Sequence, residues 1–90
     1  MSALSLPGGD LIDAGLADLS HRACTDTALL VSIGAPRLRQ LGYSVPDPFP
    51  DPEKTLFALL AREDPDTAHS RYNALIRRLV SFERAAACAR

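Results

Sequence analysis

His21 and Cys24 are the one base and nucleophile whose local spacing could support chemistry. They stand three residues apart at the end of a predicted helix, so the imidazole could activate the thiol for attack on a carbonyl group. Such a site also needs a group that stabilises the oxyanion and a third group that orients the base. Neither group can be identified in the sequence. We therefore expect a protein that is not an enzyme.

The acidic residues are explained better by helix ends than by metal binding. Most cluster where predicted helices begin, and the helix dipole favours a carboxylate in a first turn; the residues concerned are Asp10, Asp13, Glu63, Asp64 and Asp66. The sequence contains no HExxH, CxxC or EF-hand spacing, and Gly8-Gly9 follows no strand that could present a phosphate loop. We predict no metal and no cofactor.

Composition favours a small intracellular domain. Of 90 residues, 47% are hydrophobic, enough for one modest core, and chains of this size often rely on oligomerisation. Two cysteines, Cys24 and Cys88, are too few for a disulfide framework, which favours the reducing cytoplasm. Residues 1–9 lack the features of a secretory signal, and no apolar run approaches the roughly 18 residues of a membrane span. The net charge of −1 argues against a dedicated nucleic-acid binder.

The longest predicted helix covers residues 65–86. Asp64 precedes Pro65, a pairing that favours Asp64 as the N-cap and Pro65 as the first helical residue. Apolar residues then recur at alternating spacings of four and three, and they are Ala68, Tyr72, Leu75, Leu79, Phe82 and Ala86, with Ile76, Val80 and Ala87 widening the face. We predict that this face is core. Glu83 and His69 interrupt it, and an ionised carboxylate there needs a partner or access to solvent.

The opposite face of this helix is a candidate interaction surface. It consists of small residues bordered by arginines, and comprises Ser70, Arg71, Ala74, Arg77, Arg78, Ser81, Arg84 and Ala85. The simpler interpretation is that alanine favours helix formation. The alternative is that the small residues let a second helix approach closely.

A first helix is predicted over residues 10–22. Asp10 is a suitable N-cap, and Asp18 can pair with Arg22 one turn later. Gly15 weakens the helix slightly relative to alanine, so its presence suggests a close contact with another helix.

A second helix is predicted over residues 26–41, with Thr25 or Asp26 as its N-cap. Pro36 lacks the N–H donor that the helix requires and crowds the preceding turn, so we expect the helix to be kinked or split there. Gly42 suits the left-handed position that ends such a helix.

Residues 44–51 form a proline-rich connector. Proline occupies every second position from Pro46 to Pro52, which excludes helix and favours an extended polyproline conformation. Such a segment can be a ligand for an aromatic groove, or a stiff connector that Val45 and Phe49 pin to the core. We favour the connector. A third helix follows over residues 52–62.

The sequence thus predicts an all-α fold: a single domain over residues 1–90, with four helices, the last of them as the spine, and a loose arm at residues 1–9. We expect a small protein-interaction or regulatory module that acts through helix packing and self-association as a homodimer, or with an unidentified protein partner. The alternative is weak nucleic-acid binding through the arginines of the last helix.

Overall fold

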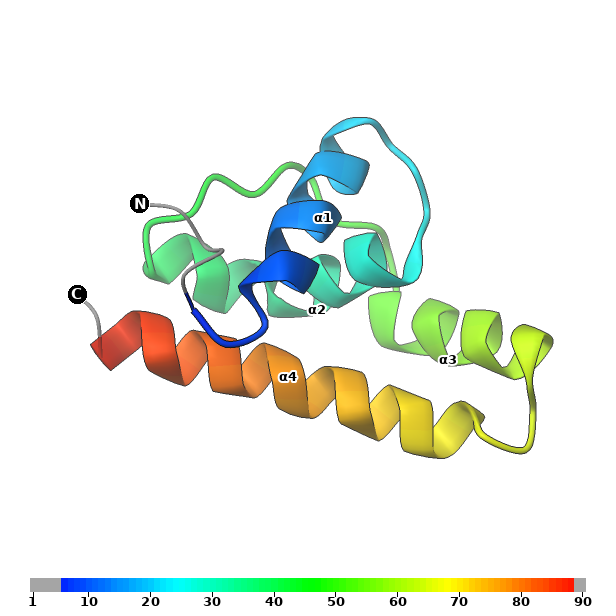
Figure 1. The fold of residues 1–90 in the computed structure, drawn as a ribbon. Helices are drawn as coiled ribbons and strands as arrows, with labels where there is room; N and C mark the ends of the chain where they lie inside the picture. Colours follow the sequence, from blue (N-terminus) through cyan, green and yellow to red (C-terminus); the bar gives the residue numbers. More distant parts are fainter. Residues whose placement is uncertain (1–5, 89–90) are drawn as a thin grey trace.

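The computed structural model describes residues 6–88, and these residues form four helices and no strand. Helix α1 spans Gly9–Ser20, α2 spans Asp26–Gln40, α3 spans Pro52–Glu63 and α4 spans Ala68–Cys88. The predicted all-α bundle is confirmed. Helix α4 runs along one side of the molecule as its longest element, with α1 and α2 beside its C-terminal half and α3 beside its N-terminal half (Figure 1).

Helix α2 lies at the centre of this arrangement, because it packs against each of the other three helices. Its side chains supply both parts of the hydrophobic core. Leu30 and Val31 belong to a cluster with Phe82 of α4 and residues of α1, whereas Leu29 belongs to a second cluster with Leu56 and Leu60 of α3. The nearly all-apolar run that the sequence shows in this helix is therefore buried on more than one side.

Two glycines allow the neighbouring helices to approach α2 closely. At Gly15 of α1, a Cβ atom would collide with the carbonyl oxygen of Thr27 and would lie 2.5 Å from Cγ2 of Val31. At Gly34 of α2, a Cβ atom would lie 2.9 Å from Cδ1 of Leu79 on α4. The close contact that the sequence suggests for Gly15 is present. Gly34 allows a similarly close approach between α2 and α4.

The predicted ends of α2 are confirmed. Thr25 is the N-cap, and its hydroxyl accepts a hydrogen bond from the backbone N–H of Ala28 at 3.2 Å. At the other end Gly42 adopts φ 101°, and the N–H of Tyr43 donates to the carbonyl of Leu38 at 3.1 Å, the Schellman arrangement. The helix runs continuously through Pro36, so it is not split there.

The prediction for α1 was wrong in its details. The N-cap is Gly8, and Asp10 lies in the first turn, where its carboxylate pairs with Arg78 of α4 at 3.4 Å. The helix also ends earlier than predicted, because Arg22 adopts the left-handed conformation with φ 56°. Asp18 does not pair with Arg22; its carboxylate accepts hydrogen bonds from the hydroxyls of Thr25 and Thr27.

Helix α4 begins at Ala68, three residues after the predicted start at Pro65. Asp64 does not cap it. The Asp64 carboxylate accepts the N–H of Asp66, and its carbonyl accepts the N–H of Thr67, so these bonds hold a local turn. Aspartate commonly competes with a helix in this way.

The proline-rich connector is held to the body of the protein by side-chain contacts from Arg22, Arg39 and Ser32. Arg22 donates to the carbonyl of Asp47 at 2.6 Å and lies over the ring of Phe49, with 4.6 Å from Cζ to the ring centroid. Arg39 donates to the carbonyl of Val45 at 2.9 Å, and the buried hydroxyl of Ser32 accepts the N–H of Phe49 at 3.2 Å. These contacts fit a stiff connector whose backbone is engaged by its own chain.

Residues 1–5 of the predicted N-terminal arm lie outside the described residues. Leu6 packs against the core, and Gly8 lies close to the backbone of Arg78 on α4. The part of the arm that the structure describes therefore covers one flank of α4.

We expect Gly15→Ala to destabilise the protein by about 1–3 kcal/mol, the usual cost of overpacking a core. Helix propensity alone would instead stabilise the variant by up to about 1 kcal/mol. Urea unfolding shows whether the free energy of unfolding falls, as overpacking predicts, or rises, as helix propensity predicts. Ala14→Gly at the neighbouring exposed position of α1 is the control, and it should cost about 1 kcal/mol through propensity. A Gly15→Ala variant as stable as the parent would contradict the close contact.

Candidate interaction surface

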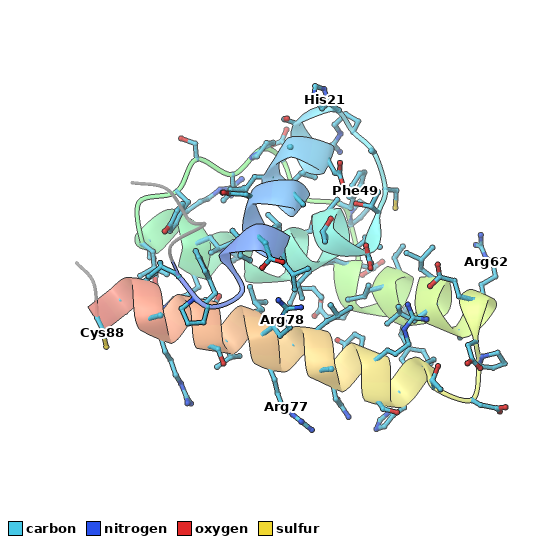
Figure 2. The ribbon with its side chains drawn as sticks, viewed as in Figure 1. His21, Phe49, Arg62, Arg77, Arg78 and Cys88 are labelled. Carbon is cyan, nitrogen blue, oxygen red and sulfur yellow. The ribbon has the colours of Figure 1, made fainter. Side chains whose placement is uncertain are left out.

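The groups that could have supported catalysis are not assembled into a site. His21 and Cys24 both lie exposed in the loop after α1, and Figure 2 shows His21 at the far end of the molecule from α4. Among residues 6–88 no three His, Cys, Asp or Glu side chains gather in a way that could hold a metal ion. Within the same residues, no helix combines the length and apolar character needed to cross a bilayer.

The structure divides the four arginines of the predicted surface into two pairs. Arg71 and Arg78 point toward the body of the protein, where Arg71 pairs with Glu63 at 3.0 Å and Arg78 with Asp10 at 3.4 Å. Both ion pairs are exposed, and pairs of this kind contribute little stability. Arg77 and Arg84 are exposed, and Figure 2 shows Arg77 directed away from the body.

The small residues of the predicted surface lie along the flank of α4 that faces α1 and the start of α2. Ser70, Ala74 and Ser81 are exposed, and Ala85 is half-buried. A surface pocket of about 210 Å³ opens beside this strip, lined by Asp26, Arg71, Ala74, Leu75 and Arg78. The strip is therefore partly walled by the same chain.

The other flank of α4 carries a second row of residues, of which the sequence predicted Ile76, Val80 and Ala87 to be core. The row comprises His69, Asn73, Ile76, Val80, Glu83 and Ala87, at alternating spacings of four and three. We call it the second seam, because it runs beside the buried row that contains Leu79 and Phe82. Val80 is 36% exposed, whereas Leu79 is 4% exposed, so the prediction that Val80 is core was wrong.

Phe57 of α3 extends the apolar surface beyond the second seam. It is 40% exposed, and its ring makes edge contacts with His69 and Tyr72, with centroid distances of 6.4 and 6.0 Å. Phe57 and Val80 are the large exposed apolar side chains of the described chain. The signal that could have identified Val80 is the width of the apolar arc on α4, which exceeds what two neighbouring helices can cover.

Glu83 is the one charged member of the second seam, and it lies beside Gly34 of α2. Its Oε2 atom lies 3.3 Å from the position that a Cβ on Gly34 would occupy. Burial against α2 raises the pKa of Glu83 above its ordinary value of 4.5, and the positive charge of Arg37 on α2 partly opposes that rise. An ionised carboxylate at this position needs a partner, and the positive charge of Arg37 on α2 serves as that partner.

Comparisons with known protein families, with characterised proteins and with solved structures find no match to this chain.

We expect Glu83→Gln to gain stability relative to the parent as pH rises from 4 to 7. The folded state raises the pKa of Glu83, so this group favours folding below its unfolded pKa of 4.5, and the benefit is lost as pH rises through the folded value. Glutamine has the same shape and does not ionise. Urea unfolding of both proteins at low concentration and at several pH values measures the difference.

Arg37→Gln is the matched control for this experiment. Without the charge of Arg37, the pKa of Glu83 should rise further, and the loss of stability with pH should grow. A parent protein that gains stability relative to Glu83→Gln between pH 4 and 7 would show that attraction to Arg37 outweighs burial.

Proposed function

We propose that this protein is a non-catalytic interaction module that works by pairing with a second copy of itself through α4. The observation that carries the proposal is the exposure of Val80 on one flank of this helix and of Phe57 on the adjacent α3. Exposed apolar residues are ordinary when scattered. Here they lie in line with half-buried Tyr72 and Ile76, and contiguous apolar surface of this kind marks interaction sites.

The small size of the chain supports pairing. A domain of 90 residues buries a limited share of its surface, and its core here is divided into two clusters on either side of α2. Each Å² of apolar surface that a partner covers contributes about 25 cal/mol. Closed two-fold pairing is the commonest way for a chain to cover such a surface.

Two surfaces of α4 are candidates for the contact. One is the strip of small residues around Ala74, which the arginines border, and the other is the second seam around Val80. We also propose that the protein acts in the cytoplasm. Cys24 and Cys88 are both exposed and form no disulfide, as expected where thiols stay reduced.

A second candidate function is weak binding of nucleic-acid phosphates by Arg77 and Arg84. Both side chains are exposed, and they stand seven residues apart, two turns along the same side of α4. The pairing of Arg71 with Glu63 and of Arg78 with Asp10, together with the net charge of −1, weighs against this function.

Light scattering across a concentration series tests the first proposal. We expect a mass that approaches twice the 9.7 kDa of one chain as concentration rises. A protein that stays monomeric at millimolar concentration would overturn self-association.

Retention on immobilised DNA and RNA at several salt concentrations tests the second candidate. Phosphate contacts make affinity fall steeply as salt rises. We expect no salt-dependent retention. Retention that disappears with salt, and that Arg77→Ala with Arg84→Ala abolishes, would favour nucleic-acid binding instead.

A further inference from the structure

We propose that two copies pair antiparallel through the second seam of α4. This pairing rests on the proposed self-association and adds to it a surface, an orientation and a register. The second seam has the alternating spacing by which helices interlock side by side, and it is offset by one residue from the row that the protein buries in its own core. One row therefore holds the monomer together, and the adjacent row is left for a partner.

The order of residues along the second seam is self-complementary when the partner helix runs in the opposite direction. With the two-fold axis midway between Ile76 and Val80, Ile76 of each copy meets Val80 of the other. Asn73 then meets Glu83, and His69 meets Ala87, because these pairs are equally distant from the axis. The apolar residues thus lie at the centre and the polar residues toward both ends.

The contact between Asn73 and Glu83 supports the antiparallel direction. Glu83 is half-buried beside Gly34, and it has only the charge of Arg37 to compensate for lost solvation. The amide of Asn73 can donate to its carboxylate across the interface, and a hydrogen bond to a charged group is stronger than one between neutral groups. A parallel arrangement would instead bring the two Glu83 carboxylates together, and like charges repel.

The exposed arginines of α4 lie at different distances from the two-fold axis. In this register Arg84 of one copy lies at the level of Tyr72 of the other, because both residues are six positions from the axis. The two Arg77 side chains lie closer to the axis, on the solvent side, where water and salt screen their repulsion.

Matched substitutions on the two flanks of α4 test the surface. Val80 and Ala74 are both exposed in the monomer, so Val80→Glu and Ala74→Glu should each leave the chain helical by circular dichroism. We expect Val80→Glu to raise the dimer dissociation constant by more than about tenfold, because it places a carboxylate in the apolar centre. Ala74→Glu should change the dimer dissociation constant by less than about threefold.

Cysteine cross-linking tests the direction and register independently of these substitutions. In a chain with Cys24→Ser and Cys88→Ser, Asn73→Cys and Glu83→Cys together should give a disulfide-linked dimer under mild oxidation. The two positions are ten residues apart, about 15 Å along one helix, so they cannot bond within a chain. Asn73→Cys alone should not cross-link.

The outcomes separate this inference from the proposed function. A parent that stays monomeric overturns both. A dimer that Ala74→Glu disrupts and Val80→Glu does not would retain self-association and overturn the second seam as its surface. Efficient cross-linking by Asn73→Cys alone would overturn the antiparallel direction.

Discussion

The close approach of α1 and α4 to α2 is the constraint on which the rest of the structure depends. At Gly15 the backbone of α1 comes so near to Thr27 that a single methyl group would not fit. At Gly34 the side chain of Leu79 fills the space that a Cβ would occupy. The contact at Gly34 fixes the rotation of α4 about its own axis, and that rotation decides which row of its residues is buried and which faces solvent.

The connector between α2 and α3 is also held in place by contacts with residues of α2 and of the loop after α1. Its carbonyls accept hydrogen bonds from Arg22 and Arg39, and Ser32 accepts the N–H of Phe49. Arg22 adopts an uncommon left-handed conformation, which ends α1 and directs its side chain to the connector. The direction in which α3 leaves α2 is therefore set by contacts between residues far apart in the sequence. Helix α4 then packs against both α3 and α2.

The sequence predicts those features that depend on neighbouring residues. Thr25 and Gly42 end α2 as expected, because the cap and the left-handed position are local in origin. Asp10 and Arg22 were predicted wrongly for the opposite reason: Arg78 and Asp47, which bond to them, lie far along the chain. Periodicity cannot anticipate such contacts.

The same limit applies to the candidate surface. Spacing alone identifies a broad apolar arc on α4, but it does not show how much of that arc the other helices cover. Val80 and Leu79 are adjacent in the sequence and equally apolar, yet only Leu79 is buried under α2. The strip around Ala74 and the row around Val80 can therefore be compared as contact surfaces only once the position of α2 is known.

The relation between the two rows of α4 can be observed directly by nuclear Overhauser effects between copies, in a sample that mixes ¹³C-labelled and unlabelled chains. If the second seam joins two copies, the methyl groups of Ile76 in one chain will show contacts to those of Val80 in the other. Contacts between copies that involve Ala74 and Ser81, with none from Ile76 or Val80, would contradict the division of α4 into one row for the core and one for the partner.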